Sequence, residues 1–196
     1  MSKMTEKIRT EVIEICDHYQ KYNEEKDDFN WYNEHVRYVV KYGILLAKKY
    51  GADEEIVELA TLLHDISMPL EIGDKSNHHT EGAKIAEQML SKLDYPTEKI
   101  EKVQQCILNH RGSVLKEKNS IEEKCVADAD AIAHFDCIPS LFQSAYGHKH
   151  MNGIEGAKSV KEKLERDFQK LSPETKEWIK ERYETILKVL FVEWEE

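Results

Sequence analysis

Apolar residues recur every three or four positions over most of the chain, which is the period of an amphipathic helix. One such pattern runs from Trp31 to Tyr50 and stops at Gly51, a residue typical of a helix C-terminus. No segment alternates apolar and polar residues as a half-buried strand would. Helices are predicted over residues 4–22, 31–50, 53–66, 78–93, 97–111, 120–136, 154–170 and 173–194.

The predicted fold class is all-α, a single compact helical domain that covers residues 1–196. A chain of 196 residues with 40% hydrophobic content is long enough to bury one sizeable core. The last predicted helix has a wide apolar stripe, which could cover the domain's own core or a partner chain. A monomer and a homodimer therefore both remain open.

Charge and cysteine usage narrow the classes of function. The net charge of −10 argues against a general nucleic-acid-binding surface, because phosphate backbones are bound by clustered Lys and Arg. The charged N-terminal segment has no signal-like apolar stretch, and no segment approaches the length of a membrane span, so we expect a cytoplasmic protein. The widely spaced cysteines predict reduced, buried thiols: they are Cys16, Cys106, Cys125 and Cys137.

Histidines and aspartates occur at several inward-facing positions of the predicted helices. The apolar run 59–63 ends in the adjacent pair His64-Asp65, and burying such a pair is costly unless something binds it. A divalent cation would do so, because imidazole and carboxylate suit first-row metals. The spacing alone leaves a metal site and ordinary core polar residues both open. The residues concerned are His35, His64, Asp65, His78 or His79, His110 and Asp130.

The order His, His-Asp, then a distant Asp on helices resembles the HD-domain superfamily of metal-dependent phosphohydrolases. The matching words are NEHVRYVVKYGILLAKKYGAD, ELATLLHDIS, HHTEGAKIAEQML, ILNHRGS and KCVADADAIAHF, at residues 33–53, 58–67, 78–90, 107–113 and 124–135. The resemblance implies an HD-domain-like helical bundle. Its metal-site core would cover about residues 31–136, with the helices over 154–194 packed on it.

The resemblance also implies a ligand set. It makes His35, His64, Asp65 and Asp130 the primary metal ligands and adds His78 and His110 in two-metal members, with Asp65 bridging both ions. The implied cofactor is one or two divalent ions, namely Mn, Fe, Ni, Co, Zn or Mg. Tyr38 stands where many relatives carry an arginine, and Arg37 is one position short.

The leading functional hypothesis is hydrolysis of a phosphate ester of a nucleotide or other small phosphorylated molecule by metal-activated water. Asp65 and Arg111 are candidate catalytic residues. His134, one turn beyond Asp130, is either a general acid or substrate contact, or a packed core histidine. The substrate phosphate is expected to meet Lys75, Arg111 and Lys116.

Two other functions stay open. Some proteins of the same fold hold two irons and use oxygen to oxidise a substrate C–H bond. A non-catalytic nucleotide-binding module, with the metal only bracing the helices, is the second alternative. The loops over 67–77 and 111–120 would set substrate specificity, and their sequences contain no motif that identifies the substrate.

Overall fold

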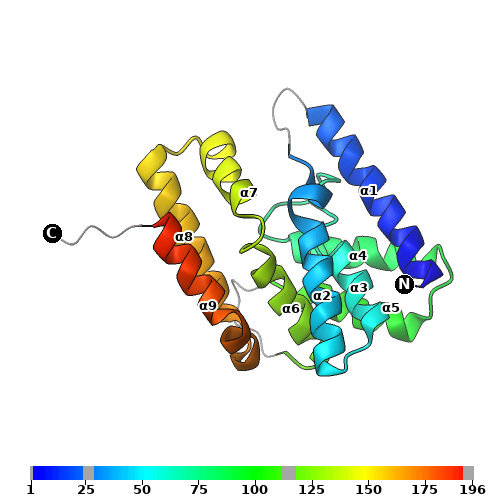
Figure 1. Cartoon of the computed structure of the whole chain (residues 1–196). Helices are drawn as coiled ribbons and strands as arrows, with labels where there is room; N and C mark the ends of the chain where they lie inside the picture. The colour runs from blue at the N-terminus through cyan, green and yellow to red at the C-terminus, as the bar shows by residue number, and fades with distance from the viewer. Residues whose placement is uncertain (1, 24–28, 112–117, 192–196) are drawn as a thin grey trace.

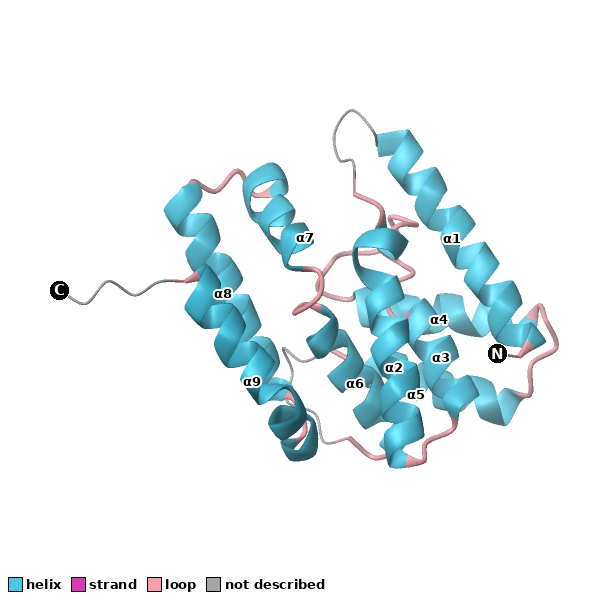
Figure 2. Ribbon diagram, in the orientation of Figure 1, coloured by secondary structure: helices cyan, strands magenta, loops and turns pink. Residues whose placement is uncertain are grey.

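The computed structural model describes residues 2–23, 29–111 and 118–191, and every regular element in this part of the chain is helical (Figure 1, Figure 2). This confirms the predicted fold class. In chain order the elements are α1 (Lys3–Asn23), the π-helical turn η1 (Tyr32–Val36), α2 (Arg37–Tyr50), α3 (Glu54–Leu63), α4 (His78–Ser91), α5 (Thr97–Asn109), α6 (Ile121–Ala133), α7 (Ile138–Gln143), a second π-helical turn η2 (Ser144–His148), α8 (Gly153–Lys170) and α9 (Pro173–Leu190).

The centre of the molecule is formed by α2, α3, α5 and α6, which pack against one another. Helix α1 covers α3, and α4 pairs with α5. Helices α8 and α9 lie on the other side of α6, at the edge of the molecule remote from α1 (Figure 1). The buried apolar side chains form one cluster that extends from Ile8 of α1 to Ile179 of α9. None of the described helices is both long and apolar enough to cross a membrane.

Capping residues set several helix ends at the places that the sequence predicts. Gly51 follows α2 in the left-handed conformation, with φ of 71°, where a side chain would be strained. The Asp53 carboxylate accepts hydrogen bonds from the backbone N–H groups of Glu55 and Ile56 at 3.0 and 3.2 Å. Ser120 caps α6 in the same way. These caps orient α3 and α6, which carry three of the predicted metal ligands.

Helix α3 ends earlier than the prediction of a helix over 53–66. The His64 ring interacts through Nδ1 with the carbonyl oxygen of Thr61 at 2.9 Å, and the N–H of Ile66 bonds to the carbonyl of Leu63. Because these bonds span three residues, the chain leaves the helix in turns. His64 and Asp65 therefore lie at the end of α3, where His64 is fully buried and Asp65 reaches the cavity wall.

The segment from Ile138 to His148 was predicted as no regular element and is helical. It forms α7 and then η2, and it packs on the N-terminal half of α8. Gly156 of α8 makes this packing possible, since a Cβ there would lie 2.1 Å from the ring of Tyr146. The segment is six residues of α-helix followed by a π turn, too short to give a clear helical period.

Candidate metal centre

Helix ends bring the six predicted metal ligands together. His35 lies in η1, His64 and Asp65 follow α3, and Asp130 lies in α6. The remaining two are His78, the first residue of α4, and His110, the C-cap of α5. His35, His64 and His110 are buried. The Asp65 and Asp130 side chains are 14% and 18% exposed, so both carboxylates reach the cavity wall.

A glycine allows α4 to approach this point. A Cβ on Gly82 would lie only 3.1 Å from the backbone oxygen of His64, closer than nine in ten real Cβ contacts. The hydroxyl of Ser67 also donates to the carbonyl of His78 at 3.2 Å, which ties the start of α4 to the turn after Asp65. The backbone of α4 is thereby fixed against the His64-Asp65 turn.

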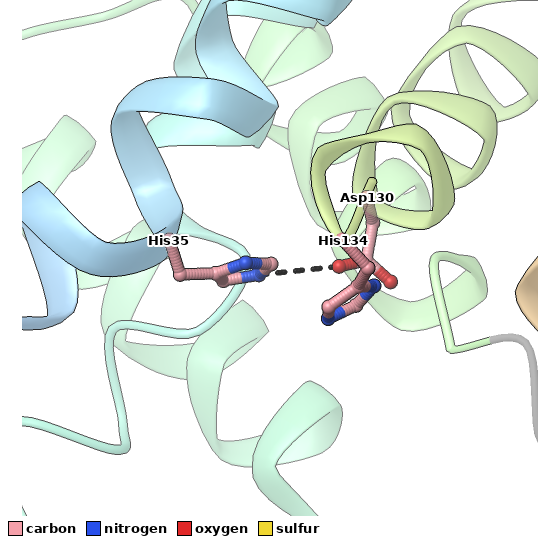
Figure 3. A group of neighbouring side chains, drawn as sticks. All are labelled: His35, Asp130 and His134. Atoms are coloured by element: carbon pink, nitrogen blue, oxygen red, sulfur yellow. Dashed lines mark ion pairs between the residues drawn. The ribbon is translucent and has the colours of Figure 1, made fainter. Parts of the chain in front are cut away.

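One group of ligand atoms gathers around the Oδ2 atom of Asp65. His64 Nε2 lies 3.4 Å from it and His35 Nε2 lies 3.7 Å from it. His35 Nε2 is also 3.2 Å from Oδ1 of Asp130, an ion pair drawn in Figure 3. Ligands about 2.1 Å from one ion lie roughly 3.0–3.5 Å from one another. The spacing of these four side chains is therefore close to that of a metal shell.

A second group gathers around the other oxygen of Asp65. His78 Nε2 and His110 Nε2 lie 3.4 and 3.7 Å from Oδ1. The same two nitrogens are 3.2 Å from each other. Each oxygen of one carboxylate thus faces a different pair of histidines, the arrangement expected of a residue that bridges two ions.

Backbone carbonyls determine which nitrogen of three histidines faces the site. Nδ1 of His64, His78 and His110 lies 2.9, 2.7 and 2.6 Å from the carbonyl oxygens of the residues three positions earlier. A carbonyl can only accept, so each Nδ1 carries a proton. In the neutral rings Nε2 then presents its lone pair to the centre, as metal-binding histidines do.

The two carboxylates are ionised across the physiological pH range. Burial alone would raise the pKa of Asp65, but His64 and His110 hold it well below its usual value. Burial opposes ionisation of Asp130 in the same way, and His35 and His134 overcome it. Burial lowers the pKa of His35 more than its partner Asp130 raises it. Two fixed negative charges among imidazoles could hold a cation.

His134 joins the first group from α6. Its ring stacks on that of His35 with centroids 5.0 Å apart and an interplanar angle of 22°. Figure 3 shows His134 beside Asp130, both facing the His35 ring. His35, Asp130 and His134 each offer an atom within 4.8 Å of the others'. His134 also lines the cavity described below, and its role as a site residue stays a prediction.

A cavity of about 500 Å³ opens over the cluster. Two of the predicted phosphate-binding residues line it, Lys75 and Arg111, and an Arg111 N–H donates to the carbonyl of Ser76. Lys116 lies outside the described residues. Arg37 is exposed and donates to the hydroxyl of Tyr38 at 2.7 Å, outside the cavity lining.

Sequence reasoning missed the cations that the C-terminal part of the chain adds to this cavity: Lys149, Lys163, Arg166 and Lys170. Burial lowers the pKa of Lys75, and repulsion from Lys149 and Lys163 lowers it further, so these cations share one region. The last three recur at positions i, i+3 and i+7 of α8, a basic stripe visible in the sequence. Only the docking of α8 on α6 shows where it faces.

Comparisons with known proteins bear on the fold and on the family of this chain. Comparison with curated proteins finds no match. Among solved structures, Bacillus subtilis YpgQ is 21% identical with a TM-score of 0.69, covering 96% of this chain and 92% of its own. The structure of YpgQ in complex with ADP is 21% identical with a TM-score of 0.66, and the match covers 95% of this chain and 93% of YpgQ. An HD-superfamily hydrolase from Bacillus thuringiensis is 22% identical with a TM-score of 0.63, and the match covers 93% of this chain and 94% of that protein.

These structural similarities, at such low identity, establish the shared fold. The sequence match is more specific: the family described as HD domain matches residues 32–134, more than half of the chain. The matched region begins just before His35 and ends at His134, so it contains all six predicted metal ligands. The chain belongs to the HD domain family.

Proposed function

We propose that this protein is a metal-dependent phosphohydrolase that cleaves a phosphate ester of a nucleotide or other small phosphorylated molecule. The observation that carries the proposal is the position of Asp65, whose two oxygens each face a separate histidine pair. A carboxylate in this position can bridge two metal ions, a common arrangement for attack on phosphorus. Membership of the HD domain family supports the same reaction class.

The donor set suits first-row transition ions better than Mg²⁺, which prefers oxygen ligands. One ion would take His35, His64, Asp65 and Asp130, whose ligand atoms lie 3.2–3.8 Å from one another in the pairs His35–Asp65, His35–Asp130, His64–Asp65 and His64–Asp130. The other would take His78 and His110 with the second oxygen of Asp65. Six side chains leave coordination positions for water and for a phosphate oxygen.

Bound divalent ions would supply a hydroxide at neutral pH and polarise the phosphoryl group. The chain's own residues would then position the ester. Arg111 can contact two phosphate oxygens at once, and Lys75 adds a point charge at the cavity mouth. His134, which lines the cavity beside Asp130, would donate a proton to the leaving oxygen.

Two observations support a nucleotide as the phosphorylated molecule. The structurally similar YpgQ was solved in complex with ADP. The cavity of this chain, about 500 Å³, is within the usual range for small-molecule sites and has Phe29 and Trp31 in its wall besides the cations. Aromatic rings can stack on a base while Lys and Arg side chains hold the phosphates.

The test is phosphate release by metal-free protein reloaded with Mn²⁺, Fe²⁺, Co²⁺ or Zn²⁺. Substrates would be nucleoside mono-, di- and triphosphates, sugar phosphates and p-nitrophenyl phosphate. Turnover that requires a metal and is lost in Asp130→Asn is expected. Asp128→Asn is the matched control, because Asp128 is a buried carboxylate of α6 that binds Ser172 instead.

Other outcomes would overturn the proposal. Oxygen consumption by the iron-loaded protein without phosphate release would favour the di-iron oxygenase. Tight ADP binding without turnover under any metal would favour a non-catalytic nucleotide-binding module. Identical phosphate release by the parent and Asp130→Asn would place the activity elsewhere.

A further inference from the structure

Asp167 of α8 is a buried carboxylate that is not one of the predicted metal ligands. Its side chain is 1% exposed. It binds two cations of its own helix, Lys163 at 2.9 Å and Lys170 at 3.1 Å. Its Oδ2 atom also lies 3.1 Å from Nδ1 of His134, at the end of α6. The two lysines offset the cost of burying the carboxylate, and they leave Oδ2 in contact with His134 as well.

The contact joins Asp167 to the metal centre through a single side chain. His134 stacks on His35 and lines the cavity. Because its Nδ1 faces Asp167, Nε2 is the nitrogen left for the cavity side. Carboxylates that contact one ring nitrogen of a histidine commonly determine its tautomer and its orientation.

Lys163 also approaches Nδ1 of His134, at 3.5 Å. An ammonium group has no lone pair, so it could only donate to a bare Nδ1, whereas a carboxylate could only accept from Nδ1–H. The carboxylate is the closer neighbour, and Lys163 already lies within 2.9 Å of both oxygens of Asp167. The Oδ2 contact is an ion-pair distance without hydrogen-bond alignment. The shorter distance and the negative charge of Asp167 are what favour a proton on Nδ1.

We propose that Asp167 is a positioning residue that holds His134 with a proton on Nδ1 and with Nε2 directed at the leaving group. The catalytic part of this inference rests on the proposed phosphohydrolase function. In the step, a water oxygen forms a bond to phosphorus, and the bond to the leaving oxygen breaks. The leaving oxygen keeps the electron pair and takes the proton from Nε2 of the His134 imidazolium. The neutral ring that remains keeps its Nδ1 proton. The attacking water loses one proton, and uptake of one proton at Nε2 restores the imidazolium.

The first test needs no activity. Long-range ¹H–¹⁵N NMR on the full-length, zinc-loaded protein reports which ring nitrogen of neutral His134 carries the proton, with His134→Gln providing the assignment. We expect Nδ1–H in the parent and in Asp128→Asn, and a mixture or Nε2–H in Asp167→Asn. Nε2–H in the parent would overturn the proposal, and so would an unchanged tautomer in a folded Asp167→Asn protein.

The second test is kinetic. A nucleotide ester has an alcohol leaving group that needs a proton, whereas p-nitrophenolate leaves without one. Asp167→Asn should lower kcat for the nucleotide by about tenfold to a hundredfold and change kcat for p-nitrophenyl phosphate far less, as general-acid loss predicts. His134→Gln should show the same pattern, and the double variant should show no further loss.

The outcomes separate the two proposals. Equal losses of kcat on both substrates would indicate a structural role for Asp167 and would overturn the positioning role. If the parent hydrolyses neither substrate with any metal, the phosphohydrolase proposal fails. The tautomer measurement then still decides whether Asp167 positions His134.

Discussion

The Nε2 atoms of His35 and His64 lie 3.2 Å apart and face each other in the candidate metal centre. Two bare lone pairs at this distance repel, so a proton or a metal ion must lie between or beside them. Burial alone would lower the pKa of His64, but the neighbouring Asp65 and Asp130 raise it to about 9. The metal-free protein therefore carries a proton here at neutral pH.

Metal binding is accordingly expected to release a proton. Because the metal must displace the proton on His64, affinity for Zn²⁺ should tighten as pH rises and level off above about 9, where His64 is already neutral. A single displaced proton gives a change of about tenfold in Kd per pH unit. Isothermal titration calorimetry in buffers of different ionisation enthalpy measures both quantities. A Kd that is constant between pH 6 and 8 would contradict this interpretation of the site.

Substituting a ligand in one histidine pair should remove the ion of that pair and leave the ion of the other pair bound. His78→Gln removes a ligand from one group only, so we expect about two ions per chain in the parent and about one in the variant. Asp65→Asn should reduce both, because each oxygen of Asp65 faces one of the groups. Elemental analysis after purification and reloading gives these ratios.

His18→Gln is the control for the stoichiometry, since His18 is exposed on α1, outside the cavity. It should bind as much metal as the parent. Equal loss of metal from the His78→Gln and Asp65→Asn proteins would mean that the site binds a single ion. The bridging role of Asp65 would then be wrong.

Most residues of the candidate metal centre could be picked out from the sequence because they lie at inward positions of strongly periodic helices. His35 precedes Val39 by four residues, and Asp130 lies among the buried apolar residues of α6. Asp167 also follows this rule, three residues after the buried Leu164 and four before Leu171, but the charged residues around it hide the pattern. Its partner His134 could only be found once α8 was seen to dock on α6.

The partly buried ion pair between Arg9 and Glu58 should stabilise the docking of α1 on α3. Their side chains meet at 2.6 Å, and Arg9 also donates to the hydroxyl of Tyr32. Arg9→Ala would leave the Glu58 side chain, only 8% exposed, without this cation, at a cost of about 1–3 kcal/mol in the free energy of unfolding. Urea denaturation measures the loss. The double variant Arg9→Ala with Glu58→Leu should recover part of it, and an equal or larger loss there would contradict the desolvation argument.

The cysteine thiols should be unreactive in the folded protein. Burial raises the pKa of Cys16, Cys125 and Cys137 to about 12 and raises that of Cys106 as well, so little thiolate is present at pH 8. We expect no reaction with Ellman's reagent until guanidinium is added and all four thiols of the chain react. Cys137 is the sharpest case, because it lines the cavity and is 3% exposed. Its rapid labelling in the native protein would mean that the cavity opens in solution.

Gly82 tests whether the close approach of α4 is needed for the metal centre. Gly82→Val adds a Cβ 3.1 Å from the backbone oxygen of His64 and two further methyl groups, so α4 must move away from the His64-Asp65 turn. His78 starts this helix, and its Nε2 would then leave the position beside Asp65. We expect the variant to lose the ion held by His78 and His110 and to keep the one held by His35, His64 and Asp130. Gly153→Val is the matched control, because a Cβ on Gly153 meets nothing within 4 Å. Full metal content in Gly82→Val would mean that α4 adjusts without moving His78, and the glycine would then have no part in building the site.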